Sequence, residues 1–153
     1  MRRAEATHRS RCHCARTTIF ARAPRVVTYC HCADCRRLSG APVTAFAGFA
    51  EGDIRLLPDE GQRARGGTAQ RTFCPDCGTP LTGRYSYLPG QVFVGVGLFD
   101  DPGALPPTGH AHAGHCLSWL RIDDDLPRAQ GSDRERLDAA DRNAQKAADD
   151  GRG

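Results

Sequence analysis

Residues 74–78 read Cys-Pro-Asp-Cys-Gly, and residues 12–14 read Cys-His-Cys. Such short spacings place two thiolates on one tight turn, and zinc prefers four soft ligands in a tetrahedron. The glycine at the end of the first motif permits the backbone conformation that a ligand-bearing turn often needs. The most economical pairing joins the two motifs into one closed, structural zinc site. Its predicted ligands are Cys12, Cys14, Cys74 and Cys77.

A third motif, Cys-His-Cys-Ala-Asp-Cys at residues 30–35, leaves Cys30, Cys32 and Cys35 as a set of three. Three protein ligands plus one exchangeable position are typical of a catalytic zinc. Two alternatives stay open. The three thiols could act as redox groups, although no βαβ pattern surrounds them. A fourth ligand could instead close the site, and the candidates are His31, His110, His112, His115 and Cys116.

The rest of the chain offers a thin hydrophobic core. Its 153 residues fit one domain, and Leu, Ile, Val and Phe together make up only about 17% of them. The formal net charge is +3, so the strong self-repulsion that accompanies disorder is missing. A structural zinc site contributes on the order of 10 kcal/mol to folding, which would compensate for the small core.

Composition also excludes several classes of protein. No apolar run approaches the length that spans a bilayer, and the basic N-terminus has no apolar stretch of the kind a secretory signal requires. We therefore expect a cytoplasmic protein without membrane partners, whose eight cysteines stay reduced and serve as metal ligands or catalytic thiols. The basic residues form no clustered stripe with interleaved aromatic residues, which disfavours nucleic-acid binding. The sequence predicts no oligomeric state.

Short apolar runs punctuated by Gly and Pro predict a mainly β domain over residues 10–130, after a flexible basic arm at 1–9. One helical turn is expected near Ala33–Leu38. The alternation of valines from Val92 to Val96 is typical of a half-buried strand. The predicted strands are Thr17–Ala23, Val26–Cys30, Val43–Phe49, Thr68–Phe73, Leu81–Tyr87 and Val92–Leu98.

Residues 131–153 form a polar tail that we expect to be a frayed helix or disordered. Ser132 and Glu135 have the spacing of a capping box, which would start a helix. Leu137 is the one large apolar residue of the tail, so no apolar stripe is available to bury a helical face. Docking of the tail on the domain is therefore predicted to be weak.

Four stretches carry a family resemblance: CHCADCRRLSGAP at 30–42, FCPDCGTPL at 73–81, VGLFDDPGALPP at 96–107 and SWLRIDDDLP at 118–127. In this order they resemble the glutathione-dependent formaldehyde-activating enzyme family, which includes centromere protein V. The resemblance implies a zinc-bearing β-tent of short antiparallel strands.

Carried over position by position, the resemblance implies a structural zinc on Cys12, Cys14, Cys74 and Cys77. A second, more labile zinc falls on Cys30, Cys32 and Cys35, the implied catalytic ligands. This chain departs from the family pattern at two places. Ala15 stands where glycine usually follows the first motif, and Cys116 stands where an apolar residue or proline is common.

The family activity implied is carbon–sulfur lyase chemistry, in which glutathione and formaldehyde condense to S-hydroxymethylglutathione. Glutathione carries two carboxylates, which arginines can bind through paired hydrogen bonds. Candidate arginines are Arg36, Arg37, Arg71 and Arg84. The alternative function is a non-enzymatic zinc-binding module that engages a protein partner.

Overall fold

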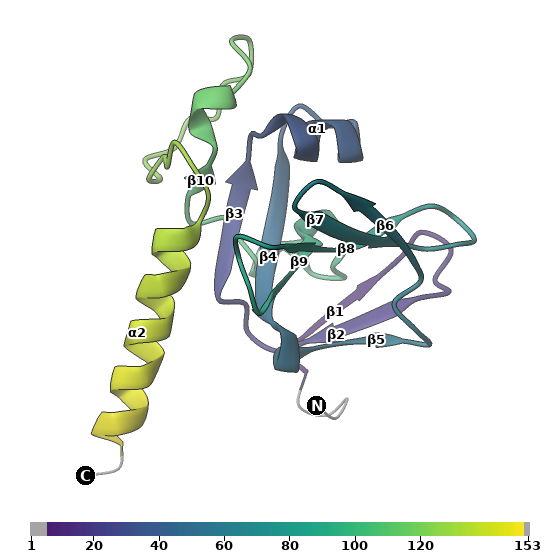
Figure 1. The fold of residues 1–153 in the computed structure, drawn as a ribbon, viewed down its shortest axis with the longest axis horizontal. Coiled ribbons are helices and arrows are strands. Elements are labelled where there is room, and N and C mark those ends of the chain that lie inside the picture. The colour runs from purple at the N-terminus through teal and green to yellow at the C-terminus, as the bar shows by residue number, and fades with distance from the viewer. Residues whose placement is uncertain (1–5, 152–153) are drawn as a thin grey trace.

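The computed structural model describes residues 6–151, which fold into two β-sheets flanked by helices (Figure 1). The smaller sheet has three strands in the order β1 (His8–Arg11), β2 (Thr18–Ala21) and β5 (Ile54–Leu57). The larger sheet has seven strands. In spatial order they are β10 (His110–Ala111), β3 (Val26–Cys30), β4 (Thr44–Ala50), β9 (Gln91–Gly95), β8 (Pro80–Tyr85), β7 (Ala69–Phe73) and β6 (Gln62–Gly66).

Every strand pair of the described residues is antiparallel except β10 with β3. The helix α1 (Ala33–Ser39) follows β3 directly, and α2 (Arg134–Asp150) ends the described chain. The mainly β architecture expected from the sequence is therefore confirmed. The strands β1, β5, β6 and β10 were not predicted, because they are short or carry few apolar residues. In β6 every residue is exposed.

The main core lies between the two sheets. Ile19 of β2 packs there with Ala47 and Phe49 of β4 and with Val94 of β9. A second cluster, formed by Val26, Leu88, Phe93 and Leu137, covers the opposite face of the large sheet. The strand β9 is consequently buried on both faces rather than half-buried, because residues beyond the strand cover Phe93.

The helix α2 runs along the side of the domain (Figure 1) and is docked by its first turn. Leu137 is 4% exposed, and Arg136 donates to Val27 O at 3.3 Å and to Asp133 Oδ1 at 2.8 Å. This docking differs from the weak attachment expected, because one buried leucine acts together with half-buried hydrogen bonds of Arg136. The capping box predicted for Ser132 is not formed, since the helix begins at Arg134 with Asp133 as its N-cap.

The structure describes the two ends of the chain only in part. Residues 1–5 of the predicted basic arm lie outside the described residues, and its last two residues, His8 and Arg9, belong to β1. Residues 152–153 of the tail also lie outside them. No helix in the described part of the chain is both long and apolar enough to cross a membrane.

Candidate metal centres

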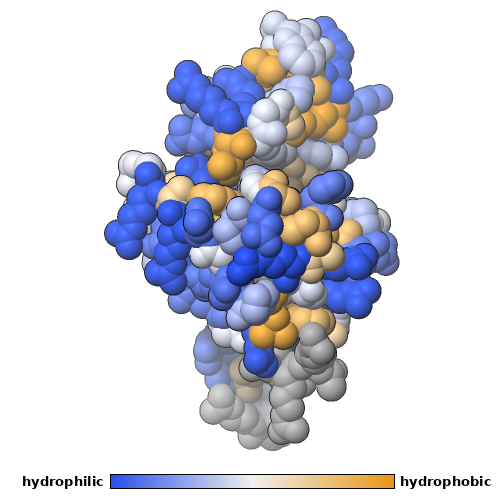
Figure 2. All heavy atoms as spheres, turned by 90° about the vertical axis from the view of Figure 1, so that its right-hand side faces the viewer, coloured by the Kyte–Doolittle hydropathy of each residue, from blue (hydrophilic) through white to orange (hydrophobic). Residues whose placement is uncertain are grey.

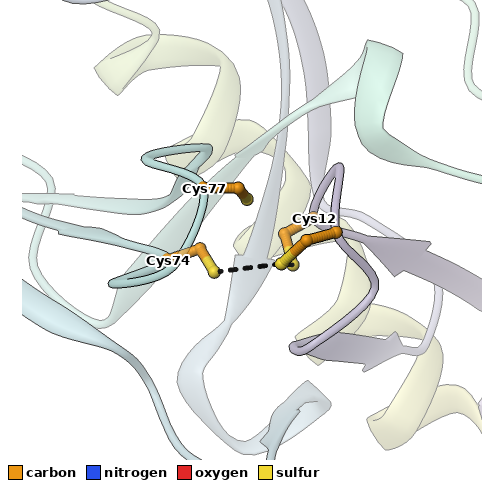
Figure 3. A group of neighbouring side chains, drawn as sticks. Cys12, Cys74 and Cys77 are labelled. Carbon is orange, nitrogen blue, oxygen red and sulfur yellow. Dashed lines mark hydrogen bonds between the residues drawn. The ribbon is translucent and has the colours of Figure 1, made fainter.

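The first cysteine cluster joins two turns from distant parts of the chain. Cys12 and Cys14 lie between β1 and β2, and Cys74 and Cys77 lie between β7 and β8. Figure 3 shows Cys74 and Cys77 on one turn facing Cys12 on the other. The structure thus brings together all four residues that the spacing paired.

Both turns close with a residue in the left-handed conformation. Gly78 has φ 72° and donates its N–H to Cys74 O at 2.8 Å, and Ala15 has φ 62° and donates to Cys12 O at 2.9 Å. Glycine adopts this conformation without strain, whereas an L-residue incurs a cost of roughly 1 kcal/mol. The alanine that departs from the family pattern therefore keeps the turn at a small energetic cost.

The sulfur geometry fits a tetrahedral metal ion. The Sγ atoms of Cys12 and Cys14 are 3.6 Å apart, those of Cys14 and Cys74 are 3.7 Å apart, and all four lie within 4.8 Å of one another. A tetrahedron with zinc–sulfur bonds of about 2.3 Å places its sulfurs about 3.8 Å apart. These residues therefore fit a zinc ion with four thiolate ligands.

Hydrogen bonds at two of these four cysteines, Cys12 and Cys77, favour deprotonated sulfur, which is the form that binds metal. Thr79 provides side-chain and backbone hydrogen bonds that lower the pKa of Cys77 to about 5. Burial raises the pKa of Cys12, but the Thr17 N–H, 3.2 Å from its Sγ, and the thiols of Cys14 and Cys74 lower it below its ordinary value overall.

The second cluster is built where β3 passes into α1. Cys30 is the last residue of β3, Cys32 is the N-cap of α1, and Cys35 lies in the first helical turn. The Sγ of Cys32 accepts the Cys35 N–H at 3.3 Å and lies 3.5 Å from the Sγ of Cys30. Hydrogen bonds from Cys30 and Cys35 lower the pKa of Cys32 to about 2, which favours the thiolate form at this position.

This second cluster has three ligands and not four. Within residues 6–151, no further Cys, His, Asp or Glu places a ligand atom in the group. Cys116 is exposed, with its Sγ 3.6 Å from Leu117 O. His112 lines a small cavity beside Cys30 and Cys35 but does not join the ligand group. The rings of His112 and His115 stack with centroids 6.4 Å apart.

His31 and His110 form a buried chain that leads away from the second cluster. His31 Nε2 lies 2.8 Å from His110 Nδ1, and His110 Nε2 lies 3.1 Å from Asp124 Oδ2. The backbone N–H of His31 donates to Ala111 O at 3.1 Å, which attaches the turn that carries the cysteines to β10. The His31 backbone and the His31–His110 contact hold the turn between β3 and α1, and neither histidine belongs to the three-cysteine group. Sequence spacing gave no signal for Asp124.

The four candidate arginines differ sharply in surroundings. Arg84 pairs with Glu60 at 2.9 Å, Arg36 donates to His115 O at 3.4 Å, and Arg37 is exposed. Arg71 has its Nε and Nη2 buried with no hydrogen-bond partner among the described residues, and its guanidinium lies 5.6 Å from the ring centroid of Tyr85.

The charge of Arg71 also reaches the second cluster. The hydrogen bond with Cys30 and the positive charge of Arg71 lower the pKa of Cys35, but Cys32 and burial outweigh them and raise it to about 11. The half-buried Arg71 thus makes a favourable, minor electrostatic contribution at one sulfur of the three-cysteine cluster.

Fold and sites together define a mainly β protein with one four-cysteine and one three-cysteine cluster, both able to hold a metal ion. The sequence profile of the glutathione-dependent formaldehyde-activating enzyme family matches residues 7–115, well over half of the chain. The chain therefore belongs to this family, as its motifs indicated.

Similar proteins include a curated relative and a solved structure. An uncharacterized lyase of Schizosaccharomyces pombe is 31% identical over 70 residues, which cover 46% of this chain and 51% of the yeast protein. The match thus spans about half the length of that relative. A crystal structure of a Rhodobacter sphaeroides protein superposes with a TM-score of 0.51 at 19% identity, over 79% of this chain and 99% of the other. That likeness supports the fold.

Proposed function

We propose that the protein is a zinc-dependent carbon–sulfur lyase. Its substrate would be the adduct of a glutathione-type thiol with formaldehyde or a related small carbonyl. Family membership and the yeast relative named as a lyase support this class of activity. The observation that carries the proposal is the contrast between the clusters, one with four sulfurs and one with three.

In this proposal the two clusters have different roles. Cys12, Cys14, Cys74 and Cys77 hold a structural zinc, because four protein ligands leave no position for a substrate. Cys30, Cys32 and Cys35 would hold the catalytic zinc and leave one coordination position free for exchange. Their all-sulfur donor set favours a soft or borderline metal such as zinc.

A zinc ion bound to three cysteines would lower the pKa of a substrate thiol and polarise a carbonyl oxygen. In the addition direction the S–H bond of the thiol breaks and a carbon–sulfur bond forms at the carbonyl carbon. The proton released from sulfur ends on the carbonyl oxygen, which becomes a hydroxyl group. The lyase direction is the reverse, and neither direction needs an oxidant or a reductant.

The residues of the chain contribute position and charge to this reaction. The hydrogen-bonded turn through Cys32 and Cys35 fixes the geometry of the three sulfurs. The buried guanidinium of Arg71 balances the negative charge that thiolates accumulate there. Since both clusters need reduced thiols, we place the protein in the cytoplasm.

Cobalt substitution tests the proposal, because thiolate-to-cobalt absorption grows with each sulfur bound. The wild-type protein should take up two cobalt ions per chain, and glutathione should raise the absorption by the equivalent of one further sulfur. Cys32→Ser should bind one ion and lose the response to glutathione while remaining folded. Cys116→Ser is the matched control and should behave as the wild type.

The alternative, a non-enzymatic zinc-binding module that engages a protein partner, makes a different prediction. A partner surface would include Trp119, which is 67% exposed on the segment after β10. A cobalt spectrum that already shows eight thiolate ligands and ignores glutathione would exclude the enzyme and favour this alternative.

A further inference from the structure

A cavity of about 350 Å³ opens beside the three-cysteine cluster, between α1 and the strands β4, β8 and β9. Its size falls within the usual range of small-molecule sites, about 300–1,000 Å³. Two contacts connect it to the cluster. Thr44 lines the cavity and is the cross-strand partner of Cys30, and Ser39 lines it and donates its hydroxyl to Cys35 O at 2.8 Å.

A smaller cavity provides the remaining connection. It is lined by Cys30 and Cys35 and shares Phe46, Tyr85 and Phe93 with the larger one. A molecule that reacts at the three sulfurs therefore has the larger cavity directly next to it.

The cavity exists because two glycines lie on this face of the sheet. Gly95 is the cross-strand partner of Phe46, and Gly83 is the partner of Phe93. Opposite residues of an antiparallel pair share a face, so a larger side chain at either glycine would occupy the space between the rings. Leu38 of α1 completes the wall and is itself 37% exposed.

The lining is uncharged throughout. Apolar side chains dominate, and the polar groups are the hydroxyls of Ser39, Thr44, Thr82 and Tyr85. Moving a carboxylate into such surroundings without a partner is costly. The charged body of glutathione is therefore a poor occupant of this cavity. Formaldehyde, with a single carbon, would fill very little of the cavity.

We propose that this cavity binds an apolar, uncharged hydrocarbon group on the carbonyl partner of the reaction. The inference rests on the proposed carbon–sulfur lyase function and specifies its substrate as an aldehyde larger than formaldehyde. The thiol stays at the three-cysteine cluster with its charged groups outside the cavity. The hydrocarbon group of the aldehyde packs against Phe46, Phe93 and Leu98.

Straight-chain alcohols test the cavity without any carbon–sulfur chemistry, because they resemble the aldehydes but do not react with thiols. NMR titration of the metal-loaded protein should show affinity rising about fourfold with each added CH₂ group until the cavity is full. An affinity that does not change from propanol to hexanol would overturn the inference.

Two variants locate the effect. An added Cβ at Gly95 meets its nearest neighbour, Leu98, at 3.9 Å, so Gly95→Val should fold and abolish the gain with chain length. Leu38→Ala, at the exposed rim, should weaken hexanol binding several-fold without unfolding the helix. Gly66→Ala is the matched control, because no atom lies within 4 Å of its added Cβ. Unchanged hexanol binding in Gly95→Val and Leu38→Ala would overturn the assignment.

The reaction itself provides a separate readout. With glutathione as the thiol, hexanal should be turned over with a higher kcat/KM than formaldehyde, and Gly95→Val should reverse that preference. A preference for formaldehyde in the wild type would overturn this inference but leave the lyase function standing. A cobalt spectrum that ignores glutathione would instead overturn the lyase function, whatever the alcohols show.

Discussion

The sulfur of Cys14 lies 3.7 Å from the sulfur of Cys74, although 60 positions separate the two residues in the chain. This contact joins the turn between β1 and β2 to the turn between β7 and β8. Figure 2 shows polar and apolar residues interspersed over one face of the domain, with apolar residues gathered in several patches. A metal ion at the four-cysteine cluster would link these two turns and supplement a core with few large apolar residues.

Cys74→Ser should destabilise the whole domain. The buried sulfur of Cys74 is one of four ligands, and its loss removes the tether between two distant turns. We expect insoluble protein, or a melting temperature lowered by ten degrees or more, measured together with zinc content. Cys116→Ser serves as control because that thiol is exposed and outside both clusters. A soluble Cys74→Ser protein that melts like the wild type would contradict the structural site.

Arg71→Gln should weaken the metal at the three-cysteine cluster. Three thiolates and one divalent cation would carry a net negative charge, and the positive charge of Arg71 would offset part of it. Changes to residues around a metal site commonly lower metal affinity 10–100-fold, and we expect about tenfold here. Competition with a chelator measures it, and the solvent-exposed Arg63→Gln should have no effect. Equal affinities in the two variants would argue against the role of Arg71.

Leu137→Ala should destabilise the docked end of α2. The side chain is 4% exposed and packs on Val26, Leu88 and Phe93, so its removal leaves a cavity. The expected loss is about 2 kcal/mol, at the low end for buried leucines because the helix lies at the edge of the domain. Urea unfolding measures it. Lys146→Ala, on the exposed part of the same helix, should leave the midpoint unchanged.

Asp100→Asn should remove a pH-dependent contribution to stability. Hydrogen bonding to Arg9 and the nearby Arg11 lower the pKa of Asp100 below its usual value, although partial burial opposes this. A lowered pKa in the folded state means that the contribution is present above about pH 4 and is lost as the pH falls through the folded pKa. Wild type and variant should therefore differ in melting temperature at pH 7 and converge near pH 2. A difference that persists in acid would exclude this origin.

The sequence by itself determined which cysteines share a turn and the class of fold. Close spacing places Cys12 beside Cys14 and Cys74 beside Cys77, because a tight turn leaves their side chains no other arrangement. Short apolar runs between Gly and Pro predicted most of the larger strands, since turn residues mark where a strand ends. Cysteine spacing and short apolar runs both depend on residues that are neighbours in sequence. They can therefore be interpreted without knowledge of the tertiary structure.

Only the tertiary structure decided which groups stand around the second cluster. The chain from His31 through His110 to Asp124 and the buried position of Arg71 arise from strand pairing between segments far apart in sequence. The cavity between Phe46 and Phe93 depends on two glycines that face the same side of the sheet. Leu137 docks α2 because it packs into the apolar cluster of Val26, Leu88 and Phe93. Helical periodicity considers only the residues of the helix itself, so it could not predict this contact.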